Sequence, residues 1–195
     1  MSDPAAQSER PLRADARRNR QLVLEAAAAA FSSEGPGVSV QEIARRAGVG
    51  TGTVSRHFPT KDALFQAIVL DRIERCVGTA RTLAETMDPA AAFFAYFAYL
   101  AQEGAVDQAL AEALVGGGFD IVAAAARSEY DFMGALGRLL TAAQRAGAVR
   151  PDVDVADIQA LVAGCLARER GHADPAARQR MIAIARDGLL VRPAR

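Results

Sequence analysis

The sequence predicts an all-α fold, in which a three-helix head precedes a larger helical body. Apolar residues recur at helical spacing along most of the chain, residues that favour helix starts stand between these stretches, and no stretch shows the alternation of a strand. We expect a disordered arm over residues 1–14, a helix-turn-helix domain over residues 15–60, and a helical body over residues 61–195.

Composition and charge argue against a membrane or secreted protein and favour a globular protein that binds nucleic acid. The 195 residues are 51% hydrophobic and 24% charged, as in a globular protein with a core. No run approaches the roughly 18 apolar residues of a membrane helix, and the amino terminus lacks a signal-peptide pattern, so we expect a cytoplasmic protein. The net charge is zero, yet the first 61 residues carry nine Lys and Arg against six Asp and Glu. This basic excess in the head is typical of nucleic-acid binding.

The cysteines and histidines give no sign of a metal site or an active site. Cys76 and Cys165 lie far apart and fit no ligand spacing, so we expect reduced thiols, with a redox-sensing pair as the alternative. His57 and His172 are too few for a metal, and neither has a catalytic partner near it in sequence. We therefore expect no cofactor, no metal and no enzymatic activity.

The first helix is predicted over residues 16–33. Its apolar face consists of Val23, Ala26, Ala27, Ala30 and Phe31. Its first turn carries Arg17, Arg18 and Arg20, and cations at this end interact unfavourably with the helix dipole. An external anion such as DNA phosphate would offset the unfavourable interaction. Arg10 and Arg13 of the preceding arm could also reach DNA, or the arm could be a plain mobile terminus.

A helix-turn-helix is predicted over residues 39–58. Ser39 and Glu42 fit the capping box that opens its first helix, and Gly48 allows the positive φ of a sharp turn. Val54 and Phe58 are the apolar positions of the second helix, which is otherwise polar. Such a helix fits the major groove of DNA, where hydroxyls reach base edges and cations reach phosphates. The alternative is an ordinary pair of packed helices.

Residues 18–65 resemble the amino-terminal DNA-binding domain of the TetR family of bacterial transcriptional regulators. The matching runs are LEAAAAAFSSEG and VSVQEIARRAGVGTGTVSRHFPTKDALFQAIV. Two positions depart from the family pattern, because Gly50 stands where a serine cap is common and Ser55 where a tyrosine often contacts phosphate. The resemblance implies a helical DNA-binding regulator.

Nine residues are candidate DNA contacts. We expect Thr51, Thr53 and Arg56 at base edges, with Gly52 between them. The residues expected on phosphate are Arg17, Ser39, Ser55, His57 and Lys61. Thr60 is predicted to cap the next helix, whose free N–H groups would form a phosphate clamp with Lys61, although Asp62 could instead satisfy this helix end.

The body is expected to hold a ligand cavity. A long helix from Lys61 towards Met87 links head and body, and Asp88-Pro89 starts a helix with five of the eleven aromatic residues. Core packing is the usual role of such a stripe, but Phe94 and Tyr99 point away from it, which favours a cavity. The candidate ligand residues are Met87, Phe93, Tyr96, Phe97, Phe119, Tyr130 and Met133. Gly116–Gly118 is a hinge or a plain loop before a helix predicted over residues 119–145.

The last two helices are candidates for dimerisation. They are capped by Asp154 and Asp174, and Gly164 and Gly188 would let helices approach closely. The candidate interface residues are Ile158, Leu161, Val162, Cys165, Ile184 and Leu189. These helices could instead complete the monomer core, but the TetR resemblance implies that they form the dimer interface.

The predicted function is a homodimeric transcriptional regulator. We expect a repressor that leaves a near-palindromic double-stranded DNA operator when a small apolar effector binds the body. The expected partners are therefore DNA, an effector and a second copy of the chain, with no membrane. A constitutive helical DNA binder without a ligand is the alternative.

Overall fold

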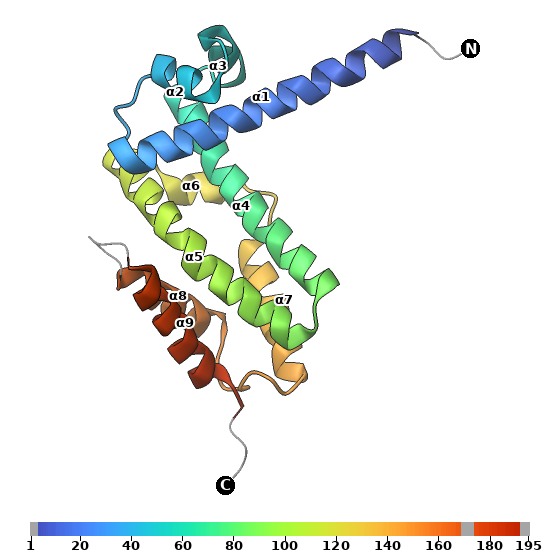
Figure 1. Ribbon diagram of the computed structural model, residues 1–195, viewed down its shortest axis with the longest axis vertical. Coiled ribbons are helices and arrows are strands. Elements are labelled where there is room, and N and C mark those ends of the chain that lie inside the picture. Colours follow the sequence, from blue (N-terminus) through green and yellow to red (C-terminus); the bar gives the residue numbers. More distant parts are fainter. Residues whose placement is uncertain (1–3, 169–173, 192–195) are drawn as a thin grey trace. The chain divides into compact units, whose positions relative to one another are not determined.

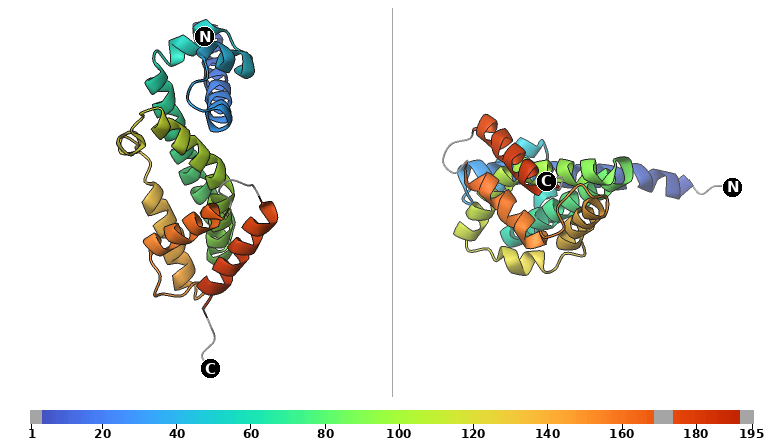
Figure 2. Two further views of the ribbon diagram at one scale, coloured as in Figure 1. Left: turned by 90° about the vertical axis from the view of Figure 1, so that its left-hand side faces the viewer. Right: turned by 90° about the horizontal axis from the view of Figure 1, so that it is seen from below.

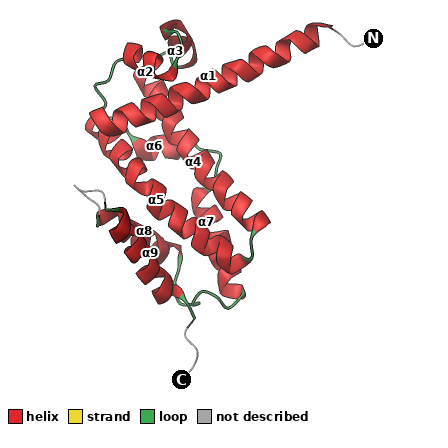
Figure 3. Cartoon of the chain, in the orientation of Figure 1, coloured by secondary structure: helices red, strands yellow, loops and turns green. Residues whose placement is uncertain are grey.

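The computed structural model describes residues 4–168 and 174–191, with side chains from residue 14 onward except those of residues 105–108. The described residues form helices and one isolated antiparallel bridge between Val149 and Leu190, without a strand, so the all-α prediction is confirmed (Figures 1 and 3). The helices are α1 (Pro4–Glu34), α2 (Val40–Ala47), α3 (Thr51–His57), α4 (Lys61–Thr86), α5 (Pro89–Gly116), α6 (Ile121–Ala125), α7 (Phe132–Arg145), α8 (Val155–Ala167) and α9 (Pro175–Leu189).

The described residues group into two compact units. The head unit takes its residues from 1–71 and 109–127, and the body unit from 72–108 and 128–195. The predicted boundary at residue 60 missed the second part of the head unit. Leu110 and Leu114 of α5 are buried in the head core, and Phe119 packs against it, so the carboxyl end of α5 belongs to the head unit.

The head core joins α1, α2, α3 and the start of α4. Phe31 of α1 and Phe65 of α4 meet edge to face with ring centroids 5.0 Å apart, and Phe119 contacts Phe65 at 5.5 Å. Val54 is the buried residue of α3, at 1% exposure. Burial of this apolar set from four helices orients the short α3, because a helix of seven residues is too short to be stable alone.

The body core contains the aromatic stripe of α5. Phe93, Tyr96 and Phe97 are fully buried, together with leucines of α7 and residues of α8 and α9. Within the body unit, α8 packs on both α7 and α9 (Figure 2). The sequence left open whether the aromatic stripe packs in the core or lines a cavity. In the structure, its residues Phe93, Tyr96 and Phe97 pack in the core.

Most helix starts follow their predicted caps. The side chains of Asp88, Asp154 and Asp174 each accept N–H groups from the first turn of the following helix. Asp154 and Asp157 form a reciprocal capping box, and Pro175 occupies the first turn of α9. Short polar side chains thus satisfy backbone donors that a helix leaves open.

Two predicted boundaries were wrong. Helix α1 begins at Pro4, so the backbone of residues 4–14, expected as a disordered arm, is helical; Ala, Gln, Glu and Arg in this stretch favour helix. The helix expected over residues 119–145 is instead two helices, α6 and α7. Asp120 and Asp131 each cap one of them, with Asp131 accepting the Gly134 N–H at 2.7 Å.

Within the described ranges, no helix combines the length and apolar character needed to cross a membrane.

Candidate nucleic-acid interface

The turn between α2 and α3 has the predicted geometry. The Ser39 hydroxyl accepts the Glu42 N–H at 3.2 Å at the start of α2, which is one half of the predicted capping box. The Glu42 carboxylate does not complete the box, because it binds Arg45 and Arg46 instead. Gly48 ends α2 at φ 67°, a conformation that glycine adopts without steric cost. Val49 then donates its N–H to the Ala44 carbonyl at 3.0 Å, which closes the turn and starts the chain toward α3.

Helix α3 has one buried side and one exposed polar side. Val54 is buried, and Phe58, which ends the helix, is 6% exposed. The predicted DNA contacts lie on the other side: Thr51, Gly52, Ser55 and Arg56 are exposed, and Thr53 and His57 are half-buried. Hydroxyl and guanidinium groups are thus available on a surface that an apolar anchor holds in place.

The remaining predicted contacts are also accessible. Arg17 on α1, Ser39 before α2 and Lys61 at the start of α4 are all exposed. Thr60, rather than Asp62, caps α4, because its hydroxyl accepts the Ala63 N–H at 3.0 Å. The ammonium of Lys61 lies 5.7 Å from the ring centroid of Phe65 and 5.9 Å from that of Phe31. These cation–π contacts hold the lysine charge at the amino end of α4.

Arg20, which the sequence analysis named beside Arg17 but left out of the nine candidate contacts, lies next to α3. Its guanidinium lies over the ring of Phe58, where α3 ends, and the side chain is exposed. Arg20 follows Arg17 by three residues, so the two cations share one face of α1. That spacing is the sequence signal that favours adding Arg20 to the candidate contacts.

Two other head arginines are engaged by carboxylates. Glu42 accepts from Arg45 at 2.7 Å and from Arg46 at 2.7 Å, and Arg46 also binds Glu34, which connects α2 to the end of α1. Hydrogen bonds from Arg45 and then Arg46 lower the pKa of Glu42 to about 2, and the Arg46 hydrogen bond lowers the pKa of Glu34. The Glu42 carboxylate is therefore the acceptor shared by Arg45 and Arg46 in this group of ion pairs.

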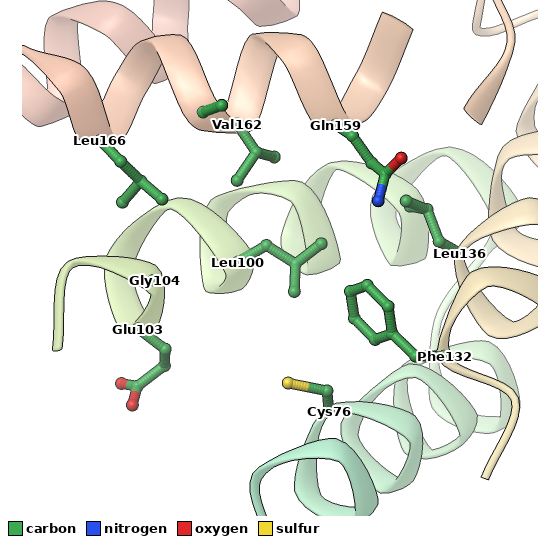
Figure 4. Close-up of a pocket in the computed structure, with 10 residues that line it drawn as sticks. Cys76, Leu100, Glu103, Gly104, Phe132, Leu136, Gln159, Val162 and Leu166 are labelled. Carbon is green, nitrogen blue, oxygen red and sulfur yellow. The ribbon is translucent and has the colours of Figure 1, made fainter. Parts of the chain in front are cut away.

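The body unit contains a cavity of about 420 Å³ (Figure 4). Its wall comes from four helices, with Cys76 from α4, Leu100, Glu103 and Gly104 from α5, Phe132 and Leu136 from α7, and Gln159, Val162, Ala163 and Leu166 from α8. Gly104 lies against Leu166, so that a Cβ on residue 104 would come within 2.8 Å of the leucine side chain. The absence of a side chain there leaves room for the close approach of α5 and α8.

The seven predicted ligand residues lie outside the wall of this cavity. Phe93, Tyr96 and Phe97 are buried in the core one to two turns before Leu100, and Phe119 belongs to the head unit. Met87, Tyr130 and Met133 are each 43% exposed. Tyr130 donates to Glu74 at 2.7 Å, and Met133 contacts the cavity wall through Gln159. The structure thus has a cavity near the aromatic stripe, but none of the seven residues lines it. Phe97 lines a second cavity of the body unit, of about 620 Å³, together with Phe94. A ligand role for the seven residues stays a prediction.

The predicted dimer residues divide into two groups. Ile158, Cys165 and Leu189 are at most 2% exposed and complete the body core, so they cannot present a surface to a partner without rearrangement. Leu161 is 37% exposed, Ile184 is 65% exposed, and Val162 is half-buried in the cavity wall. The apolar surface on α8 and α9 therefore includes Leu161 and Ile184.

Described residues contain no cluster of three or more His, Cys, Asp or Glu side chains that could hold a metal ion. Besides the ion pairs of Glu34 and Glu42, the head has exposed cations such as Arg17, Arg56 and Lys61. This arrangement suits phosphate and base recognition.

Comparison with known proteins agrees with this geometry. Residues 23–68 match the family described as bacterial regulatory proteins, tetR family, and residues 88–191 match the transcriptional regulator SbtR-like, C-terminal domain. No curated protein matches the chain.

Solved structures of family members cover nearly the whole chain. A TetR transcription regulatory protein from Mycobacterium vanbaalenii is 49% identical, with a TM-score of 0.78 over 93% of this chain and 100% of the other. A TetR transcriptional regulator from Streptomyces coelicolor is 30% identical, with a TM-score of 0.74 over 88% of this chain and 98% of the other. The chain therefore belongs to the TetR family and is a DNA-binding transcriptional regulator.

Proposed function

We propose that the protein is a homodimeric repressor that binds a near-palindromic operator through α3 of each copy. The observation that carries the proposal is the division of α3 into a buried side, anchored by Val54, and an exposed polar side that includes Thr51 and Arg56. A polar helix face held by the core of a small domain is suited to the major groove. Two copies related by a twofold axis would read two half-sites with centres about 34–36 Å apart, or a multiple of that distance.

The cavity in the body unit is the proposed effector site. Helix α4 contributes Lys61 to the head unit and Cys76 to the cavity wall, and α5 contributes Leu114 to the head core and Leu100 to the wall. Two continuous helices thus connect the DNA-binding residues to the cavity. An effector that binds more tightly to the DNA-incompetent state would lower operator affinity by the same factor by which DNA lowers effector affinity.

The proposed dimer surface lies on α8 and α9. Leu161 and Ile184 are exposed and would lose contact with water when two copies pair. Burial of such apolar surface is the main driving force for association. The buried members of the predicted interface would support this surface from within.

The proposal is tested in two steps with the full-length protein. Selection of bound DNA from genomic fragments, including the region upstream of its own gene, should yield an inverted repeat. A thermal-shift screen of apolar metabolites should then give compounds that raise the Tm and weaken operator binding. Bound DNA without twofold symmetry would contradict the dimeric operator model, and effectors that raise the Tm without changing operator affinity would favour the constitutive DNA binder.

A further inference from the structure

We propose that the body cavity selects an apolar ligand that carries a protonated amine, with Glu103 as its counter-ion. The inference rests on the proposed role of this cavity as the effector site and adds the chemical class of the effector. It follows from two properties of the wall: its apolar surface and the position of its carboxylate.

Most of the cavity wall is hydrocarbon. Leu100, Phe132, Leu136, Val162 and Leu166 supply it from α5, α7 and α8. The volume of about 420 Å³ is within the range of sites for small organic ligands. The bulk of a suitable ligand must therefore be apolar, because a polar body would lose its hydration without gaining partners.

The acidic group of the wall is Glu103. In Figure 4 its carboxylate leaves α5 on the side of α4, where Cys76 lies, and away from Val162 and Leu166 of α8. Among the described residues that line the cavity there is no Lys, Arg or His. The charge carried by this part of the wall is therefore negative.

The amide of Gln159 lies at the other end of the cavity from Glu103 in Figure 4. Its N–H group donates to the sulfur of Met133 at 3.1 Å, and its nitrogen rather than its oxygen is turned toward Leu100 and Phe132. The carboxylate of Glu103 is therefore the group of this wall that complements the N–H donors of an ammonium group.

The apolar wall makes the affinity of the cavity depend more strongly on the charge of the ligand. A cation beside Glu103 gains Coulomb energy at a lower effective dielectric than in water, whereas a ligand carboxylate would meet a like charge. The cavity should thus prefer an amine to a neutral isostere, and a neutral isostere to an acid.

Three matched probes test this order by calorimetry with the full-length protein: 4-phenylbutylamine, 4-phenylbutan-1-ol and 4-phenylbutanoate. We expect the amine to bind wild type about tenfold more tightly than the alcohol, which corresponds to about 1.4 kcal/mol, and the acid to bind most weakly. Glu103→Gln should remove the preference for the amine and leave the alcohol within about twofold of wild type. Glu85→Gln, an exposed substitution elsewhere in the body unit, should retain the preference.

The other possible results of this experiment would each contradict the proposed ligand class. Equal or tighter binding of the alcohol or the acid, or an unchanged amine affinity in Glu103→Gln, would overturn the cationic class and leave the cavity as a ligand site. Absence of binding by all three probes would overturn the inference as well. The operator release measured with compounds from the thermal-shift screen would then decide separately whether the proposed effector control holds.

Discussion

The guanidinium of Arg20 lies over the ring of Phe58, with 5.6 Å from its central carbon to the ring centroid. Arg20 belongs to α1 and Phe58 to the carboxyl end of α3, so one contact joins the first helix of the head to the helix proposed to enter the major groove. The same arginine is exposed and can bring its charge to DNA phosphate. We therefore expect this one side chain both to support α3 and to contact DNA.

We predict that Arg20→Ala weakens both the head and its DNA binding. Loss of an exposed cation–π contact should lower the free energy of unfolding by about 0.5–1 kcal/mol. Loss of a phosphate contact should reduce the salt dependence of binding by about one charge. Urea unfolding and operator titrations at several salt concentrations measure the two effects. Arg145→Ala, an exposed substitution on α7, is the control, and an unchanged salt dependence for Arg20→Ala would limit Arg20 to a structural role.

The ion pairs of Glu42 predict how stability depends on pH. Since Arg45 and Arg46 lower its pKa from 4.5 to about 2, the folded state binds the proton less tightly than the unfolded state. The stabilisation is therefore complete above pH 4.5 and is lost as the pH falls towards about 2. The measurement is the Tm of wild type and Glu42→Gln from pH 6 to about pH 2. The difference should shrink with acidification, and a constant difference would exclude this electrostatic contribution.

Two glycines in helices should respond in opposite directions to alanine. At Gly134, a Cβ would collide with the carboxylate of Asp131 that caps α7. Gly134→Ala should therefore displace the cap and destabilise the protein by about 0.5–2 kcal/mol.

Gly78 lies within α4 with open space around its Cβ position, so Gly78→Ala should stabilise the protein by about 1 kcal/mol through helix propensity. Urea unfolding checks both, and stabilisation by Gly134→Ala would show that the cap is dispensable.

The dimer proposal predicts that a charge at Ile184 separates the copies. Ile184 is 65% exposed on α9, so Ile184→Asp should leave the isolated fold intact but place a charge in the apolar interface. Size-exclusion chromatography with light scattering should show a monomer and circular dichroism an unchanged helix content. Ile184→Val, which keeps the surface apolar, is the control. A variant Ile184→Asp that remains fully dimeric at micromolar concentration would place the interface elsewhere.

The sequence predicted the head more accurately than the body, and the reason is physical. The head depends on local signals: Ser39 at a helix start, Gly48 at a positive φ, and the apolar pair Val54 and Phe58 on a short polar helix. Each of these acts within a few residues. The one contact that was missed, Arg20 over Phe58, joins residues that are distant in sequence.

The body depends on packing between distant helices, which sequence spacing does not specify. The aromatic stripe of α5 was correctly located on one face, but burial against α7, α8 and α9 decided that Phe93 and Phe97 fill the core. The cavity lies one turn later, around Leu100 and Glu103. Glu103 is the first charged residue after Asp88 in an otherwise apolar stretch, and this interruption was the signal that could have located the cavity.

The central claim is that the exposed face of α3 reads DNA sequence, and Arg56→Ala tests it most directly. Binding titrations of wild type and the variant would use the selected operator and a set with each base pair of one half-site replaced. We predict a loss of about 1–3 kcal/mol at the operator, with discrimination removed at one base-pair position and kept at the others. Unchanged discrimination at every position would contradict the claim that Arg56 and the exposed face of α3 read the operator.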